Sequence, residues 1–207
     1  MCNHITTDVT LISTAFLPKQ LPPENKPEIA LFGRSNVGKS TLINHLFNRK
    51  SSNAVARTSS VPGKTASINF YESSSATLVD LPGFGFTQNT KERNKWTVLI
   101  ETYLKERSSC VCCCLCIDFR HGLTNRDKQF LKWMSSYNHT IAIVFTKVDK
   151  VPKSKRESHK QKVLSMFTEY TSKWCLSSSK DRNTRTSLLH FFNNLIDEQK
   201  SLQNERK

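Results

Sequence analysis

The chain has 207 residues, 37% of them hydrophobic and 23% charged, which is typical of a soluble globular protein with one domain. No apolar run is long enough to span a membrane, and residues 1–10 lack the pattern of a secretory signal, so we expect a cytoplasmic protein that does not contact membranes. The net charge of +14 favours a polyanionic partner, with RNA the leading candidate, although a merely solvated surface also accounts for it.

Apolar runs alternate with amphipathic segments from Glu28 onwards, and this alternation predicts the secondary structure in chain order. We expect strands over 29–32, 67–71, 76–79, 110–118, 141–145 and 173–176. We expect helices over 41–47, 91–107, 125–137 and 187–196, with a lysine-rich segment over 153–170 and loops over 17–26, 50–65 and 82–90. The alternation predicts an α/β fold in three layers, with a mainly parallel central sheet and helices on both faces.

Five of the seven cysteines lie between Cys110 and Cys116, where neither a disulfide framework nor a paired metal spacing is evident. Free cysteine behaves as a small hydrophobe, and the run continues as Leu115-Cys116-Ile117-Asp118, so we expect a buried parallel strand. A zinc site is the alternative. It is disfavoured because neighbouring side chains of a strand point to opposite faces.

The strongest motif is Gly33-Arg34-Ser35-Asn36-Val37-Gly38-Lys39-Ser40, which follows the first buried strand and opens the first helix. It matches a phosphate-binding loop, in which glycines let backbone N–H groups point inward and the helix start adds a positive partial charge. Lys39 is expected to reach the β- and γ-phosphates of a nucleotide, and Ser40 to ligate Mg²⁺. The predicted contacts are Gly33, Arg34, Ser35, Asn36, Val37, Gly38, Lys39, Ser40 and Thr41.

A second motif, Asp80-Leu81-Pro82-Gly83, follows the strand predicted over 76–79. Its carboxylate is expected at the carboxyl edge of the sheet, where it would hold Mg²⁺ through water, and Gly83 would let a backbone N–H approach the γ-phosphate. Alone, this tetrapeptide is an ordinary turn; the phosphate-binding loop upstream gives it meaning.

A third motif, Thr146-Lys147-Val148-Asp149, directly follows the strand over 141–145 and indicates which base is bound. Asp149 can accept hydrogen bonds from N1–H and N2–H₂ of guanine, which adenine does not offer, and Lys147 would lie along the base plane. A weaker signal is the segment Leu176-Ser177-Ser178, whose backbone N–H groups would face guanine O6; a plain serine turn is its alternative.

With these motifs in place, the sequence resembles the translation-factor-related GTPases, and most closely the EngB/YihA/YsxC family of ribosome-biogenesis GTPases. The closer match rests on residues 33–44, on Arg57-Thr58-Ser59 leading to Pro62-Gly63-Lys64-Thr65, on Ile68-Asn69-Phe70, on residues 80–86, and on Asp118-Phe119-Arg120-His121-Gly122. The resemblance implies a P-loop GTPase domain over 27–197, an N-terminal extension over 1–26 that packs on it, and a polar tail over 198–207.

The same resemblance implies that Thr65 is a switch threonine, which joins Ser40 and Asp80 at Mg²⁺ when a γ-phosphate is present. Lys39 and Thr65 would then stabilise the transition state of GTP hydrolysis. The loop around Thr65 adds the expected nucleotide contacts Gly63, Lys64, Thr65, Ala66 and Ser67. The chain departs from the family after Ser178, where a glycine is usual and Ser179 stands; Asn183 is a candidate to make the turn.

Phe84 occupies the position where many GTPases carry a glutamine that orients the attacking water, so we expect slow intrinsic hydrolysis and assign no general base. Asn36 lies where related GTPases without that glutamine bind K⁺, and a cation there would stabilise phosphate charge. A residue that merely hydrogen-bonds the loop is the equal alternative.

These features together predict a Mg²⁺-dependent GTPase switch, bound to GTP or GDP, that acts in assembly of the large ribosomal subunit precursor and is needed for normal cell division. Its partners would be rRNA and ribosomal proteins, and we expect a monomer. The alternative is a signalling or septation switch that acts on a protein surface without a direct RNA role, although no lipidation motif supports a membrane-linked version.

Overall fold

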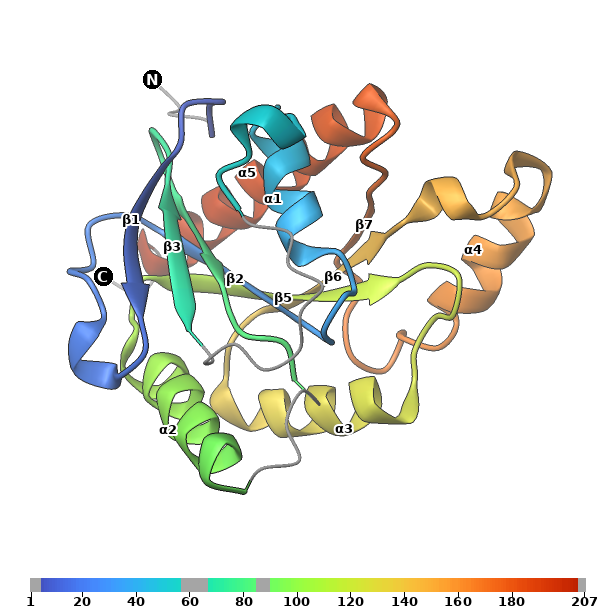
Figure 1. The fold of residues 1–207 in the computed structure, drawn as a ribbon. Coiled ribbons are helices and arrows are strands. Elements are labelled where there is room, and N and C mark those ends of the chain that lie inside the picture. Colours follow the sequence, from blue (N-terminus) through green and yellow to red (C-terminus); the bar gives the residue numbers. More distant parts are fainter. Residues whose placement is uncertain (1–4, 57–66, 85–89, 205–207) are drawn as a thin grey trace.

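The computed structural model describes residues 5–56, 67–84 and 90–204, which form one central sheet covered by helices on both faces (Figure 1). Its strands stand in the order β1-β3-β4-β2-β5-β6-β7. The pairs from β4 to β7 are parallel, and β3 is antiparallel to both β1 and β4. The strands are β1 (Thr10–Ala15), β2 (Glu28–Gly33), β3 (Ile68–Glu72), β4 (Thr77–Asp80), β5 (Cys110–Asp118), β6 (Ile141–Thr146) and β7 (Trp174–Leu176).

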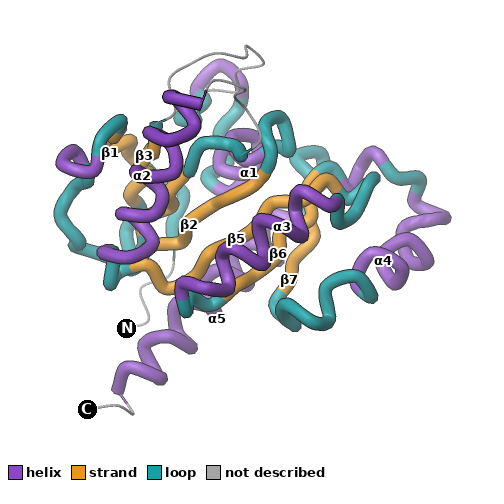
Figure 2. Tube along the Cα trace, turned by 90° about the horizontal axis from the view of Figure 1, so that it is seen from below, coloured by secondary structure: helices purple, strands orange, loops and turns teal. Residues whose placement is uncertain are grey.

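Two apolar cores separate the sheet from its helices. Helices α1 (Lys39–Leu46) and α5 (Arg182–Asn204) pack on one face, whereas α2 (Thr90–Glu106), α3 (Asn125–Met134) and α4 (Arg156–Leu164) contribute to the core on the other. In Figure 2 the strands β2, β5, β6 and β7 run side by side, with α3 over β5 and β6, and the last turns of α5 extend past the sheet. The predicted three-layer α/β fold with a mainly parallel sheet is confirmed.

The cysteine-rich segment forms the central strand β5, which is buried along its whole length. Its five residues from Cys113 to Ile117 alternate between the two cores, with Cys113, Leu115 and Ile117 on one side and Cys114 and Cys116 on the other. A strand covered on both faces must be apolar throughout, and cysteine meets that demand as a small hydrophobe. The prediction of a buried parallel strand is confirmed.

Local capping explains where α3 begins. The side chain of Thr124 accepts a hydrogen bond from the Asp127 backbone N–H, and the Asp127 carboxylate accepts from Thr124 in return. The apolar residues Phe130, Leu131 and Met134 then fall on one face and enter the core. The α-helix ends at Met134 rather than at the predicted residue 137. The three residues that follow, Ser135–Tyr137, form a 3-10 turn instead.

Two further expectations are wrong in detail. No strand was expected in 1–26, yet β1 pairs with β3 at the edge of the sheet; most of its side chains are exposed, so it lacks an alternating pattern. The last helix is longer than the predicted 187–196 at both ends. Its first turn is fixed where Thr184 Oγ1 lies 2.7 Å from Asp181 O, and its distal part is tied to β7 by an ion pair between Lys173 and Glu198.

Among the described helices, none combines the length and the apolar character that crossing a membrane requires.

Candidate functional site

The predicted phosphate-binding loop forms a tight turn between β2 and α1. Gly33, Asn36 and Gly38 have positive φ angles of 149°, 60° and 111°. Three of the six residues from Gly33 to Gly38 thus have a backbone conformation that side chains disfavour, and glycine occupies two of these positions. A side chain at Gly38 would meet nothing closer than 3.6 Å, so its positive φ, not lack of space, is what demands glycine there. Lys39 opens α1 directly after this turn, so the helix N-terminus faces the inside of the loop.

The segment after β4 lies against the same loop. Phe84 N donates to Gly33 O at 3.2 Å, and Phe84 and Arg34 form an isolated parallel bridge. A Cβ atom built on Gly83 would stand 2.8 Å from the backbone nitrogen of Ser35. Glycine is therefore required at this position by the close approach of two backbones. The structure thus brings the first two predicted motifs into contact.

Asp80 ends β4 as a buried carboxylate, with 9% of its surface exposed. Its Oδ1 atom receives no hydrogen bond from any described residue. Burial raises the pKa of this carboxyl group, and the nearby Lys39 ammonium offsets the rise only in part. A buried charge that the protein leaves partly unpaired is costly, so this oxygen is poised to bind a cation.

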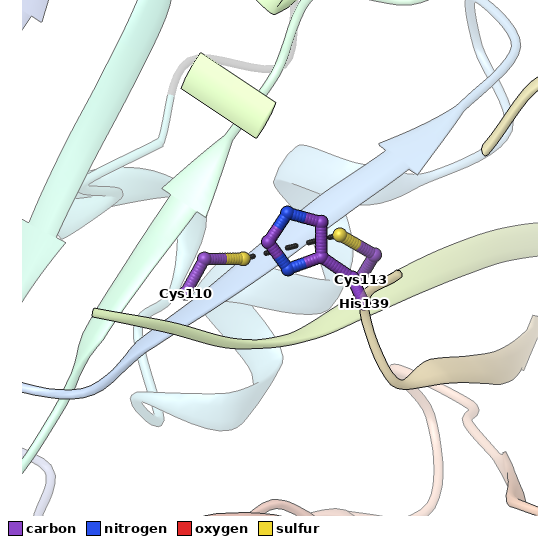
Figure 3. Close-up of side chains that lie close together, drawn as sticks. All are labelled: Cys110, Cys113 and His139. Atoms are coloured by element: carbon purple, nitrogen blue, oxygen red, sulfur yellow. Dashed lines mark hydrogen bonds between the residues drawn. The ribbon is translucent and has the colours of Figure 1, made fainter. Parts of the chain in front are cut away.

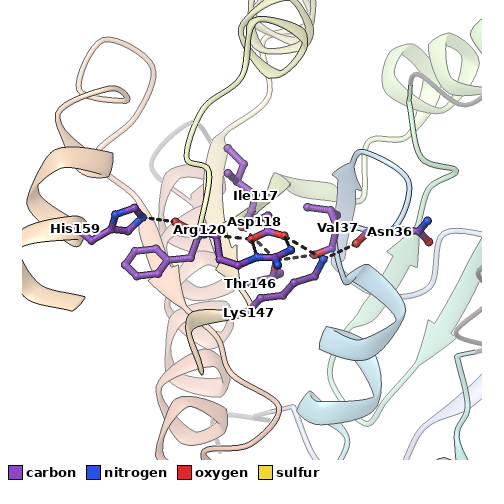
Figure 4. Close-up of polar contacts among 9 residues, drawn as sticks. Asn36, Val37, Ile117, Asp118, Arg120, Thr146, Lys147 and His159 are labelled. Carbon is purple, nitrogen blue, oxygen red and sulfur yellow. Dashed lines mark hydrogen bonds and ion pairs between the residues drawn. The ribbon is translucent and has the colours of Figure 1, made fainter. Parts of the chain in front are cut away.

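The third motif is joined to the loop by hydrogen bonds from two side chains (Figure 4). Thr146 Oγ1 donates to Val37 O at 2.6 Å, and Lys147 Nζ donates to Asn36 O at 2.7 Å. Lys147 also forms an ion pair of 3.0 Å with Asp118 Oδ2 at the end of β5. These contacts hold the predicted base-binding segment beside the phosphate-binding loop.

Asp118 was not among the predicted site residues, although it is central to this network. Arg120 donates to both of its carboxylate oxygens, at 2.9 and 2.7 Å. Burial alone would raise the pKa of Asp118, but the hydrogen bonds from Arg120 and Lys147 outweigh it, and the pKa is lowered. The available signal was its position: it ends a buried strand and pairs in register with Thr146.

Asp149 and the serine turn, two segments that the sequence assigned to guanine, are in contact. Ser178 Oγ donates to Asp149 Oδ1 at 3.1 Å, while Ser177 N donates to Phe145 O at 2.7 Å and places the turn at the end of β6. Thr184 Oγ1 lies 2.9 Å from Ser178 O, so the first turn of α5 steadies the segment. Because Ser178 orients the carboxylate of Asp149, these two residues form one unit.

Helix α3 packs against the phosphate-binding loop and the segment after β4. Phe84, 9% exposed, stacks on Phe130 with ring centroids 4.1 Å apart and an interplanar angle of 9°. Arg34 Nε lies 3.5 Å from the carboxylate of Asp127 on the same helix. Phe84 is therefore a core residue. Arg34 pairs with Asp127 within the protein, so its charge has a partner even when no phosphate is bound.

The remaining predicted residues divide into two groups. Ser40 is half-buried and Thr41 exposed in the first turn of α1, Leu81 and Pro82 lie between Asp80 and Gly83, Val148 follows Lys147, and Ser67 immediately precedes β3. Gly63, Lys64, Thr65 and Ala66 lie outside the described residues.

A phosphate-binding loop, a buried carboxylate with an unpaired oxygen and an aspartate beside a serine turn, all at the carboxyl edge of the parallel part of the sheet, define a P-loop GTPase. The family model described as 50S ribosome-binding GTPase matches residues 28–147. A probable GTP-binding protein EngB from Thermotoga sp. (strain RQ2) is 46% identical over 173 residues, covering 81% of this chain and 86% of that protein. One from Alkaliphilus metalliredigens is 44% identical over 156 residues, covering 74% and 73%.

A crystal structure of a probable GTP-binding protein EngB matches with a TM-score of 0.63 at 22% identity, covering 83% of this chain and 99% of that chain. At this identity the match shows the shared fold. The sequence relatives go further, and the chain belongs to the EngB family of GTP-binding proteins and is a GTPase.

Proposed function

We propose that this GTPase is a switch in the assembly of the large ribosomal subunit, and that the carboxyl edge of the sheet is where it holds GTP or GDP. The proposed site rests on Asp80, a buried carboxylate whose Oδ1 atom accepts no hydrogen bond from any described residue. Membership of the EngB family and a family model described as ribosome-binding support the partner, and the net charge of +14 suits contact with rRNA.

In this proposal the residues of the phosphate-binding loop, 33–41, surround the phosphates, and Lys39 neutralises their negative charge. The residues present fit Mg²⁺: Ser40 supplies a hydroxyl and Asp80 a carboxylate oxygen that lacks a described partner, the hard ligands that this ion prefers. Thr65, outside the described residues, would complete the set. Bound Mg²⁺ would neutralise charge on the phosphate oxygens.

Guanine selectivity is assigned to Asp149, oriented by Ser178. Asp149→Asn replaces an acceptor-only carboxylate by an amide that cannot accept from both guanine N–H groups. We expect GTP and GDP affinity to fall by roughly a hundredfold, the scale of two hydrogen bonds to a charged group, with a gain in xanthosine nucleotide binding. Isothermal titration with both nucleotides measures this; an unchanged preference for GTP would remove Asp149 from the site.

Slow intrinsic hydrolysis is proposed because Phe84 stacks in the core on Phe130 and carries no group that orients water. A K⁺ ion near Asn36 is proposed to assist. Turnover of the wild type and of Asn36→Ala in K⁺ and in Na⁺ tests this, since equal rates throughout would contradict it.

The ribosomal role is tested by single-turnover hydrolysis with and without purified large ribosomal subunits. We expect subunits to accelerate hydrolysis and binding to weaken as salt rises, because basic side chains would contact phosphates. No effect of subunits, together with normal nucleotide binding, would favour the alternative of a septation switch acting on a protein partner. Depletion of the protein from cells should then disturb division without accumulation of subunit precursors.

A further inference from the structure

Two cysteines and one histidine lie together at the amino edge of the sheet, opposite the nucleotide site. Cys110 and Cys113 belong to the start of β5, and His139 lies in the turn that precedes β6. The two sulfur atoms are 3.9 Å apart, and the three ligand atoms of this group all lie within 4.8 Å of one another. In Figure 3 the thiols point towards each other and the imidazole lies over the gap between them.

A β-bulge explains how cysteines three residues apart reach the same face of a strand. Against β2, Glu28 pairs with Cys110 whereas Ile29 pairs with Cys112, so β5 carries one extra residue at this point. Val111 and Cys112 therefore both face the core of α1 and α5, and Cys110 and Cys113 both face the other. Strict alternation, the reason the sequence disfavoured a metal, does not hold for this pair.

The spacing of the two sulfurs suits a soft metal ion. With Zn–S bonds of about 2.3 Å and a tetrahedral angle, two thiolates bound to one zinc ion stand about 3.8 Å apart. The observed 3.9 Å needs almost no adjustment. Thiolate and imidazole together are ligands that zinc accepts and that Mg²⁺ avoids.

The histidine has a fixed tautomer that leaves one nitrogen free to bind a metal. Its Nε2 atom lies 2.7 Å from Leu104 O, and because a carbonyl only accepts, Nε2 carries the hydrogen. Nδ1 then holds the lone pair. A hydrogen bond from the second ring nitrogen to a backbone carbonyl is the usual support of a metal-binding histidine.

We propose that Cys110, Cys113 and His139 bind a zinc ion, with a water molecule as the fourth ligand, and that this ion ties β5 to the segment before β6. His139 is half-buried and Cys110 is close to the surface, so a water can reach the open position. The role is structural, because the site stands at the edge of the sheet away from the phosphate-binding loop.

Binding must release protons. Zinc binds cysteine as the thiolate, so each thiol of the site gives up its proton to solvent when the ion binds. Two thiol protons therefore leave for each zinc ion bound, and no oxidant or reductant takes part.

The same strand supplies a matched control. Cys112 and Cys114 lie on the other face with their sulfur atoms 3.8 Å apart, and both are fully buried. No histidine, cysteine or carboxylate among the described residues joins them as a third ligand. Both faces of β5 thus carry a pair of thiols at a similar distance, but only the pair of Cys110 and Cys113 has an imidazole beside it.

The first test is the metal content of the full-length protein, produced without a histidine tag and purified in a reducing buffer without chelators. We expect one zinc ion per chain in the wild type and in Cys112→Ala. Cys113→Ala and His139→Ala should lose zinc affinity by more than the roughly 10–100-fold that loss of an outer-shell partner costs. Zinc-free wild type, or equal zinc in Cys112→Ala and Cys113→Ala, would overturn the proposal.

The second test starts from the wild-type protein, whose metal ligands are identified directly. X-ray absorption of the zinc-loaded wild type should show two sulfur neighbours at about 2.3 Å and a nitrogen at about 2.0 Å. Cobalt substitution should give thiolate charge-transfer bands that change in His139→Ala, whereas GDP binding stays unchanged. A zinc shell made of oxygen and nitrogen alone would contradict the assignment.

Discussion

Glu28 and Asp80 are buried carboxylates at opposite edges of the parallel sheet, and the protein pairs one of them and leaves the other partly unpaired. At the amino edge, Glu28 is 2% exposed, Arg107 pairs with its carboxylate, and Tyr103 donates to it at 2.9 Å. At the carboxyl edge, Asp80 is also buried, but its Oδ1 atom has no donor among the described residues. The carboxylate of Glu28 is satisfied within the protein, whereas Asp80 keeps one oxygen that a bound ion could use.

This difference separates structural from functional burial of charge. A buried ion pair that is fully hydrogen-bonded holds its neighbours in place, and removal of one partner leaves the other stranded. An unpaired buried carboxylate lowers the stability of the free protein and raises its affinity for a cation. Substitutions at Glu28 and at Asp80 should therefore have opposite effects on the stability of the nucleotide-free protein.

The largest effect is expected for Glu28→Gln. The neutral amide cannot balance the buried guanidinium of Arg107, so the free energy of unfolding should fall by about 3 kcal/mol. Urea denaturation measures it. Glu101→Gln, which breaks the exposed pair with Lys105, is the control and should cost less than about 0.5 kcal/mol. If Glu28→Gln lowered the free energy of unfolding no more than Glu101→Gln does, the pairing of Glu28 with Arg107 would not be a source of stability.

The next effect concerns Asp80→Asn. Removal of the unpaired charge should leave the stability of the nucleotide-free protein unchanged or higher, while Mg²⁺-dependent GTP hydrolysis falls by roughly a hundredfold, the scale of one lost electrostatic contact in an active site. Steady-state hydrolysis and urea denaturation of the same preparation give both values. A loss of stability like that expected for Glu28→Gln would show that Asp80 is a structural residue.

A smaller effect is expected for Gly83→Ala, because the new Cβ would meet the Ser35 backbone nitrogen at 2.8 Å and displace the phosphate-binding loop. GTP affinity should fall by about tenfold, a misplacement effect without loss of any functional group. Gly122→Ala is the control: its φ of 64° also disfavours a side chain, but it lies against Val163. The control should lose stability and keep its nucleotide affinity; equal affinities in both variants would mean that the contact at Gly83 is unimportant.

The smallest effect is a pH dependence at Asp118. Its pKa is lowered in the folded state, so it stabilises the protein above the ordinary value of 3.8, and this contribution is lost as the pH falls through the folded-state pKa. Asp118→Asn should therefore cost stability at neutral pH, about 1 kcal/mol after allowance for its partial exposure, and nothing in strong acid. Denaturation of the nucleotide-free proteins from pH 7 down to pH 2 measures this: the difference between the variants should stay constant above the ordinary value of 3.8 and shrink below it, with Asp197→Asn as an exposed control. A pH-independent difference would point to lost packing.

Much of the site was predictable because its motifs are local. The turn at 33–40, the carboxylate at Asp80 and the pair of Asp149 and Ser178 each follow a buried strand, and parallel strands bring their carboxyl ends to one edge. Asp118 was not predicted as a site residue, because its role depends on its pairing with Arg120 and Lys147, and the pairing with Lys147 spans two strands. The edge strand β1 was not predicted, because its mostly exposed side chains do not alternate between apolar and polar.

The sequence by itself determined the succession of strands and helices along the chain from Glu28 onwards, the phosphate-binding loop and the family, because periodicity, glycine placement and motif spelling act over a few neighbouring residues. Only the tertiary structure decided which charges are paired, where the bulge in β5 falls and that His139 meets Cys110 and Cys113. These depend on register and packing between segments far apart in the chain, and no local pattern records the distance between them.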